Sequence, residues 1–156
     1  MKRTVQIDDI DRRITRALQG DATLSSVDLA NIAGASAASC WRRVKALEAN
    51  GVLGRAVRLI DPALMGKGVT VFCHVRLKSH GESSEAEFRT FVDGRSEIME
   101  CYSISGEWDF MLRIIVGDVE DYEHFLMRTL LKQAVVATAS SLFALRQIKY
   151  TTEIPL

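Results

Sequence analysis

The sequence has 156 residues and a mass of 17.4 kDa, with 47% hydrophobic and 26% charged residues. This composition excludes intrinsic disorder, a collagen-like repeat and a coiled-coil rod. No apolar run reaches the about 18 residues that a membrane helix needs, and residues 1–8 lack the apolar stretch of a secretory signal. The three cysteines are widely spaced and never form a C-x-x-C pair, which argues against a disulfide framework or a cysteine zinc site. We therefore expect a cytoplasmic protein with no metal and no cofactor.

The charge is unevenly distributed along the chain, although the net charge is zero. Residues 1–60 hold ten Lys/Arg against six Asp/Glu, a net +4, and residues 61–156 hold ten against fourteen, a net −4. A basic first part is suited to an anionic partner such as nucleic acid. A chance fluctuation in charge explains the pattern equally well.

Residues 1–52 are predicted to form three short helices. The first two helices begin with a capping signal, which is a small polar residue followed by an acid three positions later. Each of the three ends at or next to a glycine. The expected caps and stops are, in chain order, Asp8 and Gly20-Asp21, Ser25 and Gly34, and Ser36 and Asn50-Gly51.

The second and third helices, with Gly34 between them, have the outline of a helix-turn-helix. In the third helix, Cys40, Val44 and Leu47 recur at helical spacing and are expected to face the core. Cys40 is then a small buried hydrophobe, with a redox role as the alternative. We expect a partly exposed Trp41 to pack on the first helix or the neighbouring strand instead of touching DNA. Polar residues outside the core stripe are suited to phosphates and guanine edges, with a solvated charged face as the alternative. These candidate DNA-binding residues are Ser36, Ser39, Arg42, Arg43 and Lys45.

Strand periodicity replaces helix periodicity after Pro62. We predict a connecting strand or wing at residues 53–60, and further strands at 69–77, 98–105, 110–116 and 136–150. Helices are predicted at 84–92 and 119–130. The order β-α-β-β-α-β is the ferredoxin-like arrangement, so the predicted fold class is α+β with an N-terminal helix-turn-helix. Helices on one side of the sheet leave an apolar face that a second copy of the chain would bury. The expected domains are 1–52, the connecting strand and linker 53–68, and 69–156.

Six motifs in the expected order identify a resemblance to the Lrp/AsnC, or feast–famine, family of transcriptional regulators. Each motif is weak alone, and together they span nearly the whole chain. They are Ile7-Asp8-x-x-Asp11-x-x-Ile14, Asp28-Leu29-Ala30, Ser36-x-x-x-Cys40-Trp41-Arg42-Arg43-Val44-Lys45-x-Leu47-Glu48-x-x-Gly51-Val52, Asp61-Pro62-x-x-Met65-Gly66, Glu100-Cys101-Tyr102-x-x-x-Gly106-Glu107-x-Asp109 and Lys149-Tyr150-Thr151-Thr152-x-Ile154-Pro155-Leu156.

The resemblance implies a (winged) helix-turn-helix that binds double-stranded DNA, and hence a place in the nucleoid. It also implies a C-terminal module that dimerises and senses a small molecule, usually an amino acid. In this family, dimers often assemble into tetramers or octamers. The effector cleft lies between subunits, and a Gly-x-x-Asp turn and hydroxyls of the last strand line it. Carried over, the effector-binding residues are Gly106, Glu107, Trp108, Asp109, Thr138, Ser140 and Ser141.

The chemistry of this carried-over site is consistent with an amino acid. Gly106 lets backbone amides approach a ligand closely, Asp109 can hold an ammonium group, and hydroxyls can bind a carboxylate. The alternative is that Asp109 and the hydroxyls only tie down the hairpin.

Two other functions stay open: an architectural protein that wraps DNA, and an enzyme of the haem-precursor decarboxylase type. The histidines that such an enzyme needs, His74, His80 and His124, have no metal-like spacing.

Overall fold

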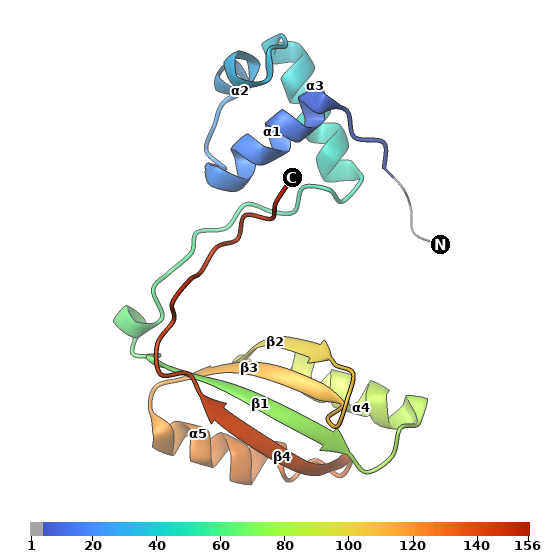
Figure 1. Cartoon of the computed structure of the whole chain (residues 1–156), viewed down its shortest axis with the longest axis vertical. Coiled ribbons are helices and arrows are strands. Elements are labelled where there is room, and N and C mark those ends of the chain that lie inside the picture. The colour runs from blue at the N-terminus through green and yellow to red at the C-terminus, as the bar shows by residue number, and fades with distance from the viewer. Residues whose placement is uncertain (1–4) are drawn as a thin grey trace. The chain divides into compact units, whose positions relative to one another are not determined.

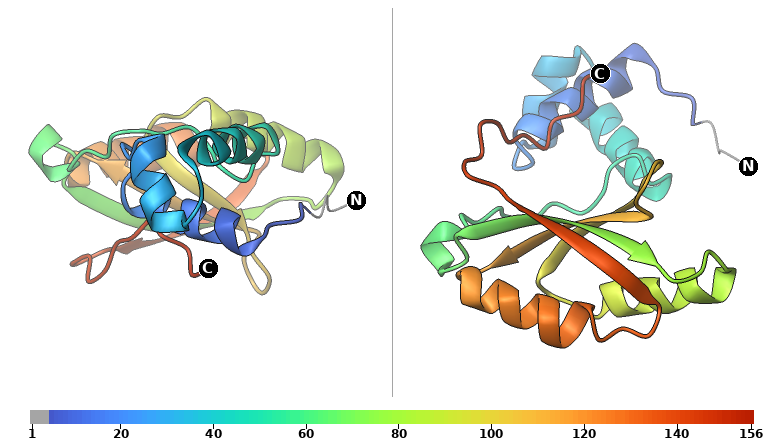
Figure 2. Two further views of the ribbon diagram at one scale, coloured as in Figure 1. Left: turned by 90° about the horizontal axis from the view of Figure 1, so that it is seen from above. Right: turned by 60° about the horizontal axis from the view of Figure 1, so that its bottom comes forward.

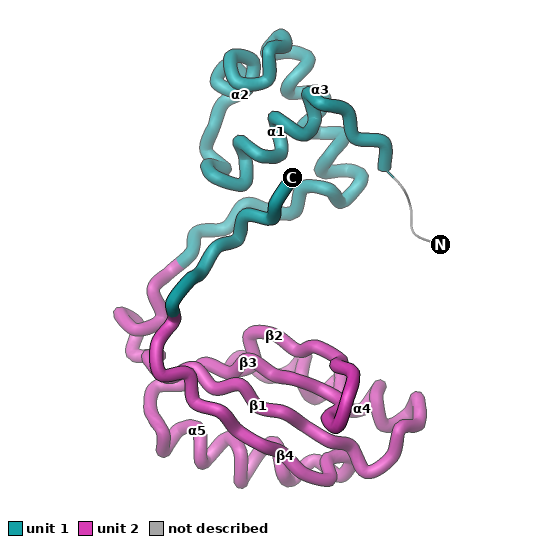
Figure 3. Tube along the Cα trace, viewed as in Figure 1, with its two compact units in different colours: residues 1–59, 148–156 teal, residues 60–147 magenta. Residues whose placement is uncertain are grey.

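The computed structural model describes residues 5–156, and the chain divides into two compact units (Figure 3). Unit 1 comprises residues 1–59 and 148–156, and unit 2 comprises residues 60–147. Residues 1–4 belong to the expected domain 1–52 and to the stretch expected to lack a secretory signal, and they lie outside the described residues. The units differ from the expected domains at the C-terminus, because the last nine residues pack with the helices of unit 1.

Unit 1 contains three helices, α1 (Asp9–Gly20), α2 (Ser26–Ala33) and α3 (Ala37–Ala49) (Figure 1). The predicted caps are confirmed. Asp8 and Ser25 each form a capping box with the acid three residues later, and the Ser36 hydroxyl accepts a hydrogen bond from the Ser39 N–H. Gly34, with φ of 68°, adopts the left-handed conformation that ends α2 and begins the turn. The helix-turn-helix is therefore set by local sequence signals.

The three helices share one small hydrophobic core. Ile14 of α1, Leu29 and Ala33 of α2, and Cys40 and Leu47 of α3 are buried, with exposed fractions of 4% or less. The predicted core stripe of α3 is confirmed, since Val44 also packs against this cluster. Burying an aliphatic side chain of this size stabilises a fold by about 1.5–3 kcal/mol. The core fixes which face of α3 points outward.

The C-terminal tail, residues 148–156, is held on α1. Gln19 donates from Nε2 to the Ile154 carbonyl at 3.2 Å and accepts at Oε1 from the Ile154 N–H at 2.8 Å. The Arg16 guanidinium donates to the Leu156 carbonyl. These bonds tie the tail to unit 1 through backbone groups, so they depend little on the side chains of the tail itself.

Unit 2 is a four-stranded antiparallel sheet with helices on one face (Figures 1 and 2). The predicted order of elements and the predicted fold class are confirmed. After a short 3-10 turn, Ala63–Met65, the strands run in the order β2-β3-β1-β4 across the sheet. The elements are β1 (Val69–Leu77), α4 (Glu82–Asp93), β2 (Ile98–Ser103), β3 (Phe110–Val116), α5 (Val119–Phe125) with a following π-helical turn (Leu126–Leu130), and β4 (Val136–Phe143).

Alternating burial along β1 separates the two faces of the sheet. Val71, Cys73 and Val75 are fully buried beneath the helices, where Phe88 of α4 lies in the same core. The intervening side chains of β1 point to the other face, which the helices leave open. The alternation predicted for this strand is confirmed.

One predicted strand is absent, and the end predicted for another was wrong. Residues 53–60 form no strand in the described chain, and the side chains of residues 54–60 are exposed. The last strand ends at Phe143 instead of residue 150, because its partner β1 begins at Val69 and only the Ala144 N–H still reaches a β1 carbonyl, that of Thr70. Apolar alternation persists in both segments without a neighbouring strand to pair with.

Candidate DNA-binding face and ligand-sensing surface

One face of α3 is exposed and carries two of the three candidate DNA-binding cations, Arg42 and Lys45. Ala38, Trp41, Arg42 and Lys45 are spaced i, i+3, i+4 and i+7, so they share this face. The opposite side of the helix holds the buried Cys40 and its core neighbours. We call these four residues the α3 outer face. A helix that follows a tight turn and presents cations outward has the geometry of a recognition helix.

Arg43 does not lie on the α3 outer face. Its Nη1 contacts Asp8 Oδ2 at 2.8 Å and Asp11 Oδ1 at 2.7 Å, and its side chain is 27% exposed. The carboxylates raise the pKa of Arg43, Asp11 first and then Asp8. The pKa of Asp8 is lowered, first by the Asp11 N–H and then by the Arg43 side chain. Arg43 therefore lies on the flank of α3, where it joins the start of α1 to α3.

The two serines of the predicted face act mainly within the helix. The Ser36 hydroxyl accepts the Ser39 N–H at 3.2 Å, which satisfies a free amide of the first turn of α3. Ser36 is exposed, and Ser39 is half-buried on the flank of the helix. The helix N-terminus itself also favours a phosphate, because its amides and dipole are positive.

Lys45 and Trp41 complete the α3 outer face. The Lys45 ammonium lies 2.8 Å from Glu48 Oε2, with both side chains exposed, and such a surface pair is weak enough to exchange for a phosphate. Trp41 is 58% exposed. The sequence analysis expected Trp41 to pack on a neighbouring element instead of contacting DNA. The helical spacing of Trp41 relative to Lys45 is the signal that places the two on one face.

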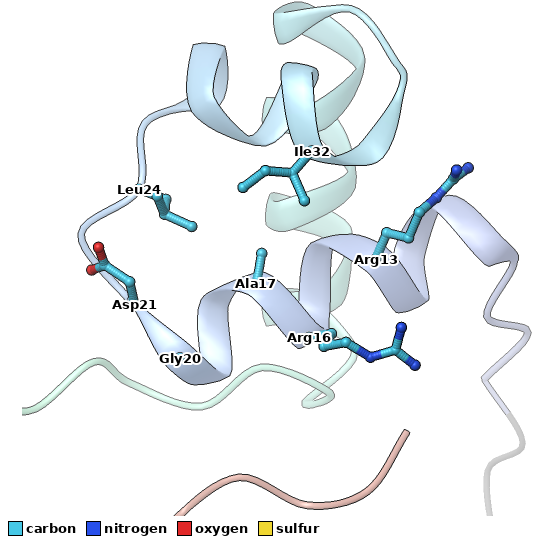
Figure 4. A pocket seen from close by; sticks show the side chains of 7 residues that line it. All are labelled: Arg13, Arg16, Ala17, Gly20, Asp21, Leu24 and Ile32. Carbon is cyan, nitrogen blue, oxygen red and sulfur yellow. The ribbon is translucent and has the colours of Figure 1, made fainter.

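A groove of about 440 Å³ lies in unit 1 between α1 and α2 (Figure 4). None of the candidate site residues lines it. Its floor is apolar, and two arginines of α1 stand at its rim. The lining residues are Arg13, Arg16, Ala17, Gly20, Asp21, Leu24 and Ile32. Arg16 also binds the terminal carbonyl of the tail, so one rim of the groove belongs to the tail anchor.

In unit 2, the turn between β2 and β3 packs against the end of β1. Gly106 has φ of 116°, and no atom lies within 4 Å of the position of an added Cβ. The turn thus uses glycine for its backbone conformation and not for lack of space. Glu107 forms an ion pair with Arg76 at 2.7 Å. Trp108 stacks on His74, with ring centroids 6.0 Å apart, while the Arg76 guanidinium lies 4.9 Å from the Trp108 ring.

Asp109 has a structural role in this turn. Its Oδ2 accepts the Leu77 N–H at 2.7 Å, and its Oδ1 lies 3.3 Å from His80 Nδ1. The Asp109 N–H in turn donates to the Val75 carbonyl. These two bonds to the β1 backbone support the alternative interpretation, in which Asp109 holds the hairpin in place. The second carboxylate oxygen, Oδ1, has the exposed His80 imidazole as its neighbour.

The three candidate hydroxyls of β4 do not converge. Thr138 pairs with Arg76 and Ser140 with His74 on the open face of the sheet. Ser141 points to the helix side, where its hydroxyl hydrogen-bonds the Tyr122 hydroxyl. This corrects the expectation of a single lining strand surface. Four of the seven candidate residues, Glu107, Trp108, Thr138 and Ser140, therefore border Arg76 or His74, and Gly106 and Asp109 belong to the same turn as Glu107 and Trp108. We call these six, with Arg76 and His74, the sensing surface: Arg76, His74, Gly106, Glu107, Trp108, Asp109, Thr138 and Ser140.

The open face of the sheet also holds a charged cluster, in which Glu100 and Tyr102 of the fifth motif meet Arg113, a residue that the sequence analysis did not single out. Arg113 of β3 donates to Glu100 Oε1 at 2.6 and 2.9 Å, and the Tyr102 hydroxyl donates to Glu100 Oε2 at 3.0 Å. The pKa of Glu100 is lowered, mainly by the Arg113 side chain. Cross-strand pairing of residues 100 and 113 requires the register of the sheet, which the sequence alone does not give.

Within residues 5–156, no group of three or more His, Cys, Asp or Glu side chains is arranged to hold a metal ion. In the same part of the chain, none of the helices combines the length and the apolar character that crossing a membrane demands.

Comparison with known protein families matches both parts of the chain. Residues 7–48 match the AsnC-type helix-turn-helix domain, and residues 70–154 match the Lrp/AsnC ligand binding domain. The glutamate uptake regulatory protein of Zymomonas mobilis is 34% identical over 97% of this chain and 92% of its own.

Two solved structures share the fold over nearly their full length. A crystal structure of an AsnC family transcriptional regulator from Agrobacterium tumefaciens is 42% identical, with a TM-score of 0.89, and the match covers 96% of this chain and 97% of that one. A transcriptional regulator from Neisseria meningitidis, solved as an L-Met complex, is 30% identical, with a TM-score of 0.90 and the same coverage. The protein described here belongs to the Lrp/AsnC family of transcriptional regulators.

Proposed function

We propose that this protein is a DNA-binding regulator whose DNA binding or assembly responds to an amino acid bound at the sensing surface. The observation that carries the proposal is the two-sided α3. Its inner side is fixed by a buried core, and its outer face presents Arg42 and Lys45 after a helix-turn-helix turn. The chain works in the nucleoid, and its activity is binding, not catalysis.

The DNA contacts divide into two kinds. Arg42 and Lys45 contact phosphates or guanine edges, and the α3 N-terminus at Ser36 and Ser39 contacts a phosphate. Arg43 positions α3 through Asp8 and Asp11, so its effect on DNA is indirect. A dimer reads a two-fold symmetric site with half-sites about one helical turn, or a multiple of it, apart.

The effector contacts use the open edge of the sensing surface. Thr138 and Ser140 offer hydroxyls to a carboxylate, and Asp109 and Glu107 offer oxygens to an ammonium group. Amino-acid response is supported by two relatives, one named for regulating glutamate uptake and one solved with L-Met. The cleft closes between subunits, so the dimer, and in larger assemblies the tetramer or octamer, forms the complete site.

The domains that carry these tasks are residues 1–52 for DNA and residues 69–156 for sensing and assembly, joined by 53–68, and the last nine residues of the second domain pack with the helices of unit 1. The sheet face that the helices leave open supports a homodimer. It carries Phe72 and Leu142 beside the Arg113–Glu100 pair, which is the mixture of apolar and charged groups that a subunit interface buries.

The effector site is tested with Ser140→Ala, using Ser141→Ala as the matched control on the same strand. Calorimetric titration with single amino acids identifies a binder for the wild type. Loss of a hydrogen bond to a charged group lowers its affinity about 10-fold or more in Ser140→Ala. Ser141→Ala removes a bond to Tyr122 on the helix side, so it lowers stability and keeps affinity. Equal affinities in the wild type and Ser140→Ala contradict the placement of the effector.

A further inference from the structure

The α3 outer face contains an aromatic side chain that the fold does not use. Trp41 is the only aromatic residue among the first 71 of the sequence. It belongs neither to the buried core of unit 1 nor to the partly buried side chains around that core. An indole left 58% exposed keeps a large apolar surface in water. Folding of unit 1 therefore gives no reason for a tryptophan at this position.

The neighbours of Trp41 identify the kind of partner that covers it. Arg42 and Lys45 lie beside it on the same exposed face, and Ala38 lies one turn earlier. Ala38 has a small side chain, which permits close approach of the helix to a surface. An apolar ring flanked by two cations fits a polyanion with apolar groups between its charges. The major groove of DNA has this character, because thymine C5-methyl groups lie between the phosphate backbones.

We propose that Trp41 reads thymine C5-methyl groups in the major groove and so contributes to sequence specificity, which rests on the proposed DNA-binding function. The indole ring packs on the methyl group, and its single N–H donor can reach an acceptor on a base edge. Trp41 is the fifth residue of α3, within the N-terminal half that faces base edges in helix-turn-helix proteins. Arg42 holds the helix against the backbone while Trp41 reads the bases.

The test removes one methyl group at a time. The duplex is the tightest-binding one selected from random sequence by the full-length protein. Each thymine in turn is replaced by deoxyuridine, which lacks only the C5-methyl. For the wild type, we expect one or two positions in each half-site to lose about four-fold in affinity, the effect of one buried methyl. Trp41→Ala binds the parent duplex more weakly and shows no loss at those positions, as a double-mutant cycle requires.

Arg42→Ala is the matched control on the same face. It weakens binding to every duplex and keeps the deoxyuridine penalty at the positions read by Trp41. Thermal melting checks that Trp41→Ala folds, as expected for a residue outside the core. Trp41→Phe, which keeps an aromatic ring, retains part of the penalty.

Three results overturn the proposal. The deoxyuridine penalty is the same in the wild type and in Trp41→Ala, or the wild type has no such penalty while Arg42→Ala still weakens binding. In both cases the protein binds DNA without this contact, and the proposed function stands. Alternatively, Trp41→Ala leaves DNA affinity unchanged and shifts the mass measured by light scattering, so that a second copy of the chain covers the indole. If no duplex is selected at all, the proposed function fails together with the inference.

Discussion

Arg42 and Arg43 are adjacent in sequence, and the structure predicts that their replacement by alanine affects different properties, DNA binding for Arg42 and stability for Arg43. Arg42 lies on the exposed face of α3. Arg43 is 27% exposed and bonded to two carboxylates of the α1 start. We expect Arg42→Ala to weaken DNA binding without loss of stability. We expect Arg43→Ala to destabilise unit 1 and to affect DNA only through the position of α3.

The size of the Arg42 effect follows from counterion release. One lost phosphate contact lowers the slope of log affinity against log salt by about 0.9, so a dimer that loses two contacts changes by about 1.8. Between about 50 and 200 mM salt, the deficit of Arg42→Ala relative to the wild type then shrinks about 12-fold. Arg43→Ala leaves Asp11 without its partner at 13% side-chain exposure. We expect a loss of about 1 kcal/mol, or about 4–8 °C in a unit of this size.

Fluorescence anisotropy with a labelled duplex at four salt concentrations gives the slopes, and circular dichroism melting gives the stabilities. The reasoning is refuted if Arg43→Ala changes the salt slope as much as Arg42→Ala and melts at the wild-type temperature. In that case the Arg43 guanidinium leaves its two carboxylates to bind DNA, and the distinction between the exposed and the paired arginine is wrong.

Three further predictions concern the scaffold. Phe88→Ala, which empties a fully buried site in unit 2, lowers the free energy of unfolding by about 3–5 kcal/mol in a denaturant titration. Gln19→Ala removes both bonds to Ile154 and lowers unit 1 stability by about 1–2 kcal/mol; a protease that cuts the tail no faster than in the wild type contradicts this. Because Arg113 holds the folded-state pKa of Glu100 below its ordinary 4.5, the unfolded chain takes up the proton first as pH falls. The stabilisation is therefore present above about pH 4.5 and lost at lower pH. In Glu100→Gln, we expect the melting temperature to fall less steeply as the pH is lowered. A pH profile of melting temperature equal to that of the wild type excludes the Arg113–Glu100 pair as the source of the decline.

Local signals predicted the three helices of unit 1 well because the helix ends are set by neighbouring residues. A cap needs only a serine or aspartate and the amide three residues on, and Gly34 needs only its own φ. The place of Arg43 was also open to prediction. It follows Cys40 by three residues and precedes Leu47 by four, so it borders the buried stripe of α3.

Features that depend on a neighbouring strand were not accessible from sequence periodicity. The end of β4 is set by where β1 begins, and the contact of Glu100 with Arg113 is set by strand register. Ser141 is an intermediate case. Alternation along the strand separates it from Thr138 and Ser140, but a resemblance to a family motif grouped the three hydroxyls together.

The central claim, a regulator that binds specific DNA and responds to an amino acid, is tested most directly by one titration. The full-length protein is titrated by fluorescence anisotropy against the region upstream of its own gene and against a scrambled duplex, each with and without pooled amino acids. We predict tighter binding to the native region and a change in that affinity when the pool is added. Equal, strongly salt-sensitive binding to both duplexes, unchanged by the pool, contradicts the claim and identifies an architectural DNA-binding protein instead.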